Sequence, residues 1–524
     1  MNFARYGIIN AKKFPDKEFL VERTPSKNLR RVLTWKEFNE KTNKVANYLQ
    51  KNLGIKKGDF VLHLQMNSLE WVITFHAILR VGAVAVPLNF RFASIDIKYA
   101  ADACEPVALI MGDGFLPKVQ PIQKEMGSIK EYICVGNNVF ADMISYEEII
   151  KSADSEDIIV EVDDDDPAEL MFTSGTTGPP KPVCQAHKTL NHIGIGNALT
   201  YAEGHETVYL APHPFYHSGS FFLSFPSYMA GGKIIIQLEL NKPEYLLDAI
   251  CEEKVNNGWV TVPTMSDTVN AIKKGDIDLN KYDFSHVTGS IVIGAQPVPS
   301  SLYQDMKKIF PFKTGNIYGI TEGGGGGTIN LYDEDVLTHP GSIGKPTFNV
   351  MARVVDEDGK DVPVGTVGEL LLKGPRNMKE YFKNPEMTSI ALRDGWLYTG
   401  DLVRMDEDGY IYIADRKKDL IIRGGENIFP VEIEDVLRRH SKIADVAVIG
   451  YPHERLVEIA MAIVQLYPGE TMTEQEIVNF CAEQGLAKYK WPEKIVFANV
   501  LRNVTGKIDK PALREKYVGK KQIV

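Results

Sequence analysis

Short apolar runs alternate with amphipathic helical patterns through the N-terminal third of the chain, and this alternation constrains the fold most strongly. The apolar runs, bounded by turn signals, span residues 60–64, 83–88 and 107–111. Thr34 and Glu37 form a capping box, and the helical pattern that follows closes at Gly54. Ser68 can cap a second helix that runs to about Arg80. Strands that alternate with helices predict a parallel sheet with helical crossover connections.

Length, charge and cysteine content limit the class of protein. A chain of 524 residues is long for one domain and indicates two or more. The net charge of −10 argues against a general nucleic-acid-binding protein. The five cysteines are scattered without a CxxC pair, which predicts a reduced, cytoplasmic protein without a cysteine metal site. The most apolar window, residues 71–88, is interrupted by His76 and Arg80, so we expect no membrane span.

The stretch from Met171 to Val183 reads Met-Phe-Thr-Ser-Gly-Thr-Thr-Gly-Pro-Pro-Lys-Pro-Val. Glycines let backbone N–H groups approach an anion, hydroxyl groups donate further hydrogen bonds, and Lys181 adds a positive charge. This composition is typical of a phosphate-binding loop. It is not a Walker A loop, because Lys181 lies between prolines and no Gly-Lys-Ser/Thr follows. Composition by itself fits a solvated turn equally well.

The order of these residues resembles the signature loop of the adenylate-forming superfamily, Thr-Ser-Gly-Ser/Thr-Thr-Gly-x-Pro-Lys-Gly. This superfamily contains acyl-CoA synthetases, luciferases and the adenylation domains of nonribosomal peptide synthetases. The chain departs from the pattern at Pro182, where glycine is usual and where proline removes a backbone donor. The resemblance implies that the ATP phosphates are held by Thr173, Ser174, Gly175, Thr176, Thr177, Gly178 and Lys181.

Two later segments resemble the superfamily's nucleotide motifs. The turn Gly294-Ala295-Gln296-Pro297 resembles the Gly-Ala-x-Pro turn that lies against adenine. The segment Asn316-Ile317-Tyr318-Gly319-Ile320-Thr321-Glu322 resembles a motif in which the tyrosine stacks on adenine, the threonine reaches the α-phosphate and the glutamate helps to hold Mg²⁺. An aromatic face suits a purine, and a carboxylate oxygen suits Mg²⁺. Taken alone, Tyr318 fits a core residue and Glu322 a surface charge.

The C-terminal third carries the remaining motifs. Trp-Leu-Tyr-Thr-Gly-Asp, ending at Asp401, resembles the segment whose aspartate accepts hydrogen bonds from the ribose. In Asp-Arg-Lys-Lys-Asp, the resemblance assigns Arg416 to the nucleotide and Lys418 to the pivot between domains. It assigns Gly424 and Gly425 to the loop over the CoA pantetheine channel. Thr-Gly-Lys-Ile near the end carries Lys507, the residue that corresponds to the catalytic lysine.

The acyl pocket is expected beside His217 and along the residues after Glu322. His213 and His217 lie four residues apart, but Pro214 stands where a zinc site of the His-Glu-x-x-His type needs glutamate, so we disfavour a metal there. The segment resembles the superfamily's Pro-Leu-Phe-His-x-x-Gly stretch beside the acyl group. We expect His217, Gly319, Gly323 and Gly324 to contact the acyl substrate. The five glycines from Gly323 favour a roomy or adaptable pocket; a flexible loop tip is the other interpretation.

The resemblance implies a fold of mixed α/β and α+β class in two parts. Residues 1–416 would form a large acyl- and ATP-binding domain with stacked, helix-covered sheets, and residues 417–524 a small mobile domain that carries the catalytic lysine. In the small domain, 445–449 and 460–466 read as strands, and Thr473 with Glu476 caps a helix.

The function implied is an AMP-forming carboxylate–CoA ligase that uses ATP, Mg²⁺ and CoA on a small-molecule acid. A cyclic, aromatic or medium-chain acid is favoured because the sequence beside His217, Phe-Tyr-His-Ser-Gly, offers no acidic partner for a substrate ammonium. The alternative is a stand-alone adenylation enzyme that loads an acyl or amino acid onto a carrier protein. A luciferase-like oxygenase is disfavoured because the C-terminal Lys-Gln-Ile-Val is not a peroxisomal signal. A non-enzymatic protein of this fold is expected to lack Lys507 or Glu322, and the chain has both.

Overall fold

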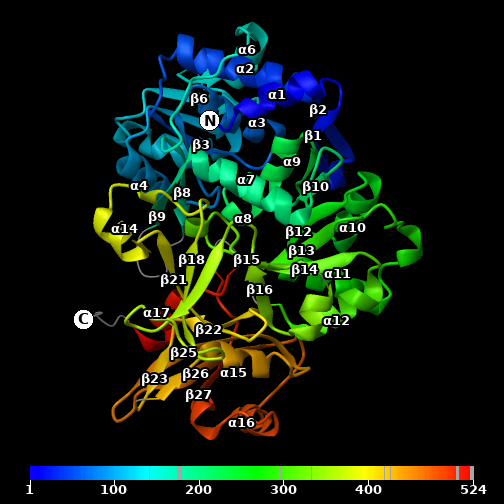
Figure 1. Cartoon of the computed structure of the whole chain (residues 1–524), viewed down its shortest axis with the longest axis vertical. Coiled ribbons are helices and arrows are strands. Elements are labelled where there is room, and N and C mark those ends of the chain that lie inside the picture. The colour runs from blue at the N-terminus through cyan, green and yellow to red at the C-terminus, as the bar shows by residue number, and fades with distance from the viewer. Residues whose placement is uncertain are drawn as a thin grey trace. The chain divides into compact units, whose positions relative to one another are not determined.

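A computed structural model describes residues 1–140, 142–173, 180–294, 298–331, 333–417, 419–424, 426–502 and 507–519. The described chain divides into two compact units, whose elements are labelled in Figure 1. Unit 1 contains residues 1–173, 180–351 and 372–397. Unit 2 contains the described residues of 352–371 and 398–524. The domain boundary expected at residues 416/417 stays a prediction.

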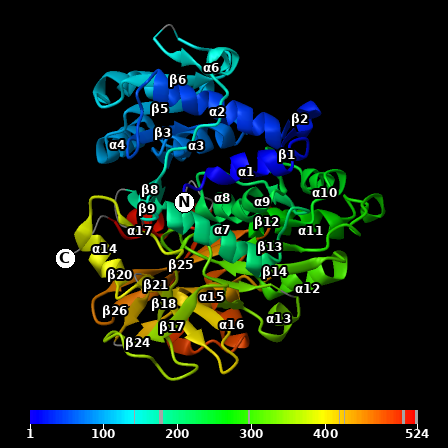
Figure 2. The same ribbon diagram turned by 45° about the horizontal axis from the view of Figure 1, so that its top comes forward.

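The first sheet of unit 1 has eight strands in the order β7-β6-β5-β3-β4-β8-β9-β19. Its strands are β3 (Phe60–Leu64), β4 (Val84–Pro87), β5 (Ala108–Gly112), β6 (Glu131–Val135), β7 (Ile144–Ser145), β8 (Pro167–Thr173), β9 (Lys181–Ala186) and β19 (Glu380–Tyr381). Strands β3 to β7 run parallel, as the alternating sequence pattern predicts, whereas β8 and β9 form an antiparallel pair. Figure 2 shows β3, β5 and β6 beside α2, α3 and α4.

The helices of unit 1 confirm the start signals read in the sequence. Thr34 and Glu37 form the expected capping box of α2, and Ser68 accepts a hydrogen bond from the Trp71 N–H at the start of α3. The helices are α1 (Arg5–Lys13), α2 (Trp35–Lys51), α3 (Leu69–Arg80), α4 (Ser94–Cys104), α5 (Leu116–Val119), α6 (Tyr146–Ser152), α7 (His187–Tyr201), α8 (Ser218–Phe221), α9 (Phe225–Ala230), α10 (Pro243–Glu252), α11 (Val262–Lys274), α12 (Ser300–Ile309), α13 (Asp333–Thr338) and α14 (Pro385–Ala391).

The second sheet of unit 1 has the order β2-β1-β11-β10-β12-β13-β14-β15-β16. These strands are β1 (Glu18–Thr24), β2 (Leu29–Thr34), β10 (Val208–Ala211), β11 (Lys233–Gln237), β12 (Asn257–Thr261), β13 (Ser290–Gly294), β14 (Lys313–Tyr318), β15 (Thr328–Asn330) and β16 (Ser342–Pro346). Helices α10, α11 and α12 connect parallel strands and pack an apolar core against this sheet. One continuous core contains side chains from both sheets and from α2, α3 and α7. The carboxyl ends of β13 and β14 therefore carry the Gly294 and Tyr318–Glu322 motifs on a rigid frame.

Unit 2 contains two groups of paired strands, and three strands of the first group have end residues that belong to unit 1. The first has the order β17-β18-β21-β22 and consists of β17 (Met351–Val355), β18 (Gly368–Lys373), β21 (Trp396–Met405) and β22 (Ile411–Arg416). The second has the order β24-β23-β26-β25 with β27 beside β26, and consists of β23 (Ile421–Arg423), β24 (Glu426–Ile428), β25 (Ile443–His453), β26 (Val457–Leu466) and β27 (Lys494–Phe497). The helices are α15 (Pro430–Leu437), α16 (Glu474–Glu483) and α17 (Lys510–Val518). The strands expected at 445–449 and 460–466 and the capping box at Thr473 are confirmed.

Candidate functional site

The expected phosphate loop is the connection of the β8–β9 hairpin. Thr173 and Lys181 are opposite each other where the two strands meet the loop, and the Thr173 hydroxyl donates to the Lys181 carbonyl at 3.3 Å. The loop residues Ser174, Gly175, Thr176, Thr177 and Gly178 lie outside the described residues. Two antiparallel strands thus fix the positions from which the loop departs.

Pro182, the departure from the usual loop pattern, lies inside strand β9. Its carbonyl accepts a hydrogen bond from the Phe382 N–H at 2.9 Å. In an antiparallel ladder the N and O atoms of one residue point to the same side. The missing N–H of Pro182 therefore faces the short strand β19 and takes nothing from the β8–β9 pairing that supports the loop.

The ends of β13 and β14 form the expected adenine region. Gly294 is buried, and a Cβ atom there would lie 2.9 Å from the Ile317 carbonyl oxygen, so the close approach of these strands requires glycine. Asn316 has a structural role, because its side-chain Nδ2 donates to the Ser342 carbonyl at 2.8 Å and its Oδ1 accepts from Asn330 at 2.7 Å. Ala295 and Gln296 lie outside the described residues.

Tyr318 ends β14, and Gly319 makes the turn that follows. The Tyr318 carbonyl accepts a hydrogen bond from the Gly327 N–H at 2.8 Å. A Cβ atom on Gly319 would lie 2.3 Å from the Gly325 carbonyl oxygen. Glycine at 319 is therefore required by the fold, whatever contact it makes with a substrate.

Thr321 and Glu322, the expected phosphate and metal residues, are held from three sides. The Gln185 side chain donates to the Thr321 carbonyl at 2.8 Å, and the hydroxyls of Ser218 and Thr321 are 3.1 Å apart. The Tyr381 hydroxyl donates to Glu322 Oε1 at 2.8 Å. Burial and the neighbouring carboxylate raise the pKa of Tyr381, so the hydroxyl keeps its proton and remains the donor.

Sequence reasoning missed Gln185, Ser218 and Tyr381. Gln185 carries one available signal, because it is a polar residue in the apolar strand β9 and is fully buried. Ser218 follows His217 directly in the motif Phe-Tyr-His-Ser-Gly. No local pattern marks Tyr381, which is 59 residues away from Glu322 along the chain.

The Glu322 carboxylate is a suitable single protein ligand for a magnesium ion. A hard divalent cation takes carboxylate oxygens, and the second oxygen of Glu322 receives no hydrogen bond from the described part of the chain. One donor on Oε1 orients the carboxylate and leaves Oε2 for a cation. The geometry therefore allows Glu322 to hold Mg²⁺, and that role stays a prediction here.

The glycine run after Glu322 is buried and closely packed. Gly324 has φ +71°, and a Cβ atom there would lie 2.7 Å from the Arg376 carbonyl oxygen and 2.8 Å from Ile193 Cγ1. Gly325 also has a positive φ. At Gly323 the nearest atom to such a Cβ is Leu397 Cδ2 at 3.5 Å, which is ordinary contact. Gly324 and Gly325 thus have a conformational reason to be glycine, and the roomy pocket stays a prediction.

His213 and His217, the latter expected beside the acyl group, have different surroundings. His213 Nε2 accepts a hydrogen bond from the Thr261 N–H at 3.0 Å, and burial lowers the pKa of His213 to about 3. The Nε2 atom of His213 therefore already accepts a hydrogen bond from the backbone. His217 precedes α8, and its ring lies 4.3 Å from the ring of Tyr216 between centroids. Aromatic side chains lie beside this segment, and its contact with an acyl group stays a prediction.

Unit 2 brings two further predicted residues together. Asp401 on β21 and Arg416 on β22 are cross-strand partners, with Arg416 Nε 3.1 Å from Asp401 Oδ1. The Asp401 side chain is buried, so its orientation is fixed by the sheet. Thr399 supports the strand end, because its hydroxyl donates to the Leu370 carbonyl at 2.7 Å.

Lys507 is exposed and lies beside the antiparallel bridge between Arg502 and Ile508. Gly424 has φ +59°, and its N–H donates to the Leu456 carbonyl at 2.7 Å. Lys418 and Gly425 lie outside the described residues. The structure therefore places Lys507 next to this bridge, and Gly424 has a backbone conformation that favours glycine.

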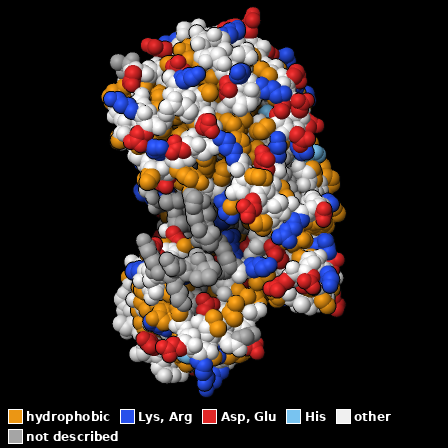
Figure 3. All heavy atoms as spheres, turned by 90° about the vertical axis from the view of Figure 1, so that its left-hand side faces the viewer, with side chains coloured by type: hydrophobic (Ala, Val, Ile, Leu, Met, Phe, Trp, Pro, Cys, Tyr) orange, Lys and Arg blue, Asp and Glu red, His pale blue; other side chains and the backbone are white. Residues whose placement is uncertain are grey.

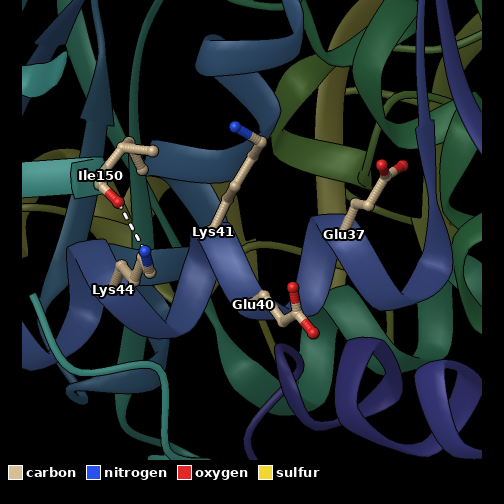
Figure 4. A pocket seen from close by; sticks show the side chains of 5 residues that line it. All are labelled: Glu37, Glu40, Lys41, Lys44 and Ile150. Atoms are coloured by element: carbon tan, nitrogen blue, oxygen red, sulfur yellow. Dashed lines mark hydrogen bonds between the residues drawn. The ribbon is translucent and has the colours of Figure 1, made fainter.

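A hollow on the outer face of α2 has a different character from the predicted site. Figure 4 shows Glu37, Glu40, Lys41 and Lys44 on α2 with Ile150 beside them, and the Lys44 ammonium donates to the Ile150 carbonyl at 2.6 Å. None of the predicted site residues lines it. We assign it no function.

Acidic and basic side chains are interspersed on the face drawn in Figure 3. This distribution differs from the continuous basic surface typical of a protein that binds nucleic acid. Among the described residues, no helix is both long and apolar enough to cross a bilayer.

Comparisons with known proteins cover both units. Residues 9–382 match the family described as AMP-binding enzyme, and residues 432–507 match the AMP-binding enzyme C-terminal domain. A long-chain-fatty-acid–CoA ligase of Mycobacterium tuberculosis is 35% identical over 500 residues, 94% of each chain. A 2-succinylbenzoate–CoA ligase of Bacillus cereus is 31% identical, over 92% of this chain and 93% of that one. The crystal structure of an anthranilate–CoA ligase with anthranoyl-AMP has a TM-score of 0.88 at 25% identity, covering 98% and 97% of the two chains.

Proposed function

The chain belongs to the AMP-binding enzyme family and is an AMP-forming carboxylate–CoA ligase, and from this premise we propose which residues carry each half-reaction. The enzyme uses ATP, Mg²⁺ and CoA to convert a carboxylic acid, through its acyl-adenylate, into an acyl-CoA. The observation that carries the assignment is the fixed geometry of Thr321 and Glu322 at the end of β14.

The first half-reaction forms the acyl-adenylate. A carboxylate oxygen attacks the α-phosphorus of ATP in line, the bond to the β-phosphate bridging oxygen breaks, and pyrophosphate leaves. Positioning and charge neutralisation dominate such a transfer. We assign Lys507 to the incoming carboxylate and the α-phosphate, and Thr321 to the α-phosphate. Lys181 and the loop from Thr173 to Gly178 hold the β- and γ-phosphates.

Other residues hold the nucleotide. Glu322 would hold Mg²⁺, which would supply positive charge beside the phosphates. Tyr318, with Gly294, Ala295, Gln296, Asn316 and Ile317, forms the adenine site, and Asp401 with Arg416 holds the ribose. The buried, ion-paired Asp401 supports that role, because a fixed carboxylate can accept from both ribose hydroxyls.

The second half-reaction forms the thioester. The CoA sulfur, having lost its proton, attacks the acyl carbon; the carbon–oxygen bond to AMP breaks, and AMP leaves with that electron pair. Gly424 and Gly425 line the CoA channel. We place the domain boundary at residues 416/417, with residues 417–524 turning about Lys418 between the half-reactions, which is a gating step.

We propose a neutral cyclic, aromatic or medium-chain acid as the substrate, bound beside His217, Gly319, Gly323 and Gly324. The aromatic surroundings of His217 support an apolar acyl group. The relatives are named for a long-chain fatty acid, 2-succinylbenzoate and anthranilate, which supports a carbon-rich acid.

We also propose that the enzyme works in the cytoplasm, since Cys104, Cys134, Cys184, Cys251 and Cys481 are all free thiols.

Separate assays of the two half-reactions test the lysine assignments. Lys507→Ala should reduce adenylation by about 10²–10³-fold, yet largely spare thioester formation from a supplied acyl-adenylate. Lys516→Ala is the matched control, because Lys516 is another exposed lysine of unit 2. Equal loss of both half-reactions in Lys507→Ala would refute its assignment.

Lys418→Pro tests the pivot. Pyrophosphate exchange should stay near the wild-type rate while thioester formation falls, since only the second half-reaction needs the rotation. Equal damage to both half-reactions would contradict the hinge assignment.

A further inference from the structure

Tyr381 contacts two charged groups that the proposed function assigns to the phosphate end of ATP. Its hydroxyl donates to Glu322 Oε1 at 2.8 Å. Its ring lies under the Lys181 ammonium, with 5.4 Å from Nζ to the ring centroid. One side chain therefore joins the carboxylate assigned to Mg²⁺ and the cation assigned to the β- and γ-phosphates.

The backbone around Tyr381 is fixed against both partners. Tyr381 is opposite Val183 in the β19–β9 pairing. Val183 is two residues after Lys181 on β9. The Met378 N–H donates to the Glu322 carbonyl at 2.7 Å, which ties the same segment to the metal residue. The Tyr381 side chain is 94% buried, in an apolar cluster with Val183, Met378 and Leu397. Such packing leaves the ring little freedom to turn.

The chemistry of this arrangement favours a role in positioning. A carboxylate that accepts one hydrogen bond on Oε1 is held in one rotamer and presents Oε2 to a cation. A ring face under an ammonium group attracts the charge without neutralising it, so the lysine remains able to bind an anion. Both effects reduce the reorganisation that is needed when a metal-bound triphosphate arrives.

We propose that Tyr381 is a positioning residue that aims the Glu322 carboxylate at Mg²⁺ and the Lys181 ammonium at the β- and γ-phosphates. The inference rests on the proposed function, because that function assigns Glu322 and Lys181. Tyr381 itself touches no reacting atom.

Calorimetric titration of the enzyme with ATP, in excess Mg²⁺ and separately in EDTA, tests the metal half of the proposal without turnover. Tyr381→Phe removes the hydroxyl and keeps the ring over which Lys181 lies. Replacement of a residue that hydrogen-bonds to a metal-binding carboxylate typically lowers metal affinity by about 10–100-fold. Mg²⁺ should raise the ATP affinity of wild type by some factor, and we expect this factor to be at least about tenfold smaller in Tyr381→Phe. ATP binding in EDTA should stay within about twofold of wild type.

Tyr146→Phe is the matched control. The Tyr146 side chain is also buried in unit 1, and its hydroxyl makes no hydrogen bond in the described structure. Both titrations of this variant should equal those of wild type. An undiminished Mg²⁺-dependent gain in Tyr381→Phe, or an equal loss in Mg²⁺ and in EDTA, would overturn the metal half.

Tyr381→Leu tests the Lys181 half, because it removes the ring as well. We expect ATP binding in EDTA to weaken by about threefold or more relative to Tyr381→Phe. Equal binding of the two variants in EDTA would overturn this half. If the wild-type enzyme binds ATP equally well in Mg²⁺ and in EDTA, the proposed metal role of Glu322 is refuted. This outcome is read from the wild-type enzyme and does not depend on any variant.

Discussion

Replacement of Val457 by glycine should relieve backbone strain in unit 2. Val457 opens β26 with φ +69°, in the left-handed region that costs an L-residue about 1–2 kcal/mol. A β-branched side chain is a particularly poor occupant of this region.

The matched control is Val364→Gly. Val364 is also 63% exposed and also lies in unit 2, but its φ is not positive. Both substitutions remove the same side chain from the same exposure and add the same freedom to the unfolded chain, worth about 0.4–1 kcal/mol of destabilisation. Only Val457→Gly also relieves strain. The free energies of the two variants should therefore differ by about 1–2 kcal/mol in favour of Val457→Gly.

Hydrogen exchange measured on peptides from β25 and β26 gives the local opening free energy of the Val457 site, and peptides spanning 352–371 give that of the control. A difference of 1.4 kcal/mol corresponds to about a tenfold change in an equilibrium constant. We express the hydrogen-exchange protection of each variant relative to wild type. This ratio should be about 5–30-fold higher for β25 and β26 in Val457→Gly than for residues 352–371 in Val364→Gly. Equal loss of protection in the two variants would refute the strain argument.

Three further predictions concern stability. Thr34→Ala, which removes the cap of α2, should lower the free energy of unfolding of unit 1 by about 1 kcal/mol in urea titration. Gly324→Ala should destabilise by at least about 2 kcal/mol, because φ is +71° and the new Cβ would meet the Arg376 carbonyl, whereas Gly323→Ala should cost less than about 1 kcal/mol in the same assay. Burial raises the pKa of Glu203 to about 8, so the folded state keeps a proton that the unfolded state loses above about pH 4.3. The free energy of unfolding should therefore fall as the pH rises from about 4.3 to about 8. Glu203→Gln should be at least about 1 kcal/mol more stable than wild type at pH 8, but not at pH 4.

Local patterns predicted much of the fold. The strand expected at 60–64 and the capping boxes at Thr34 and Thr473 agree with the structure, because each depends on neighbours within a few residues. The apolar runs at 83–88 and 107–111 correspond to β4 and β5, with each end shifted by one residue.

The surroundings of the site were harder to predict. The contact of Tyr381 with Glu322 and that of Gln185 with Thr321 join residues 59 and 136 positions apart, and only the folded sheet brings them together. The glycine run shows the same limit: its composition indicated freedom, whereas the structure shows that Gly324 is needed for a close approach to Arg376. Motifs identified the residues, and tertiary contacts explain how they are held.

A panel of carboxylic acids supplied with ATP, Mg²⁺ and CoA is the most direct test of the central claim. AMP release and the mass of the acyl product should be followed together, with acetate, medium-chain, aromatic and alicyclic acids side by side. We predict one AMP and one acyl-CoA per acid consumed, with a neutral cyclic, aromatic or medium-chain acid preferred. AMP or acyl-adenylate without a CoA thioester, for every acid tried, would contradict the account.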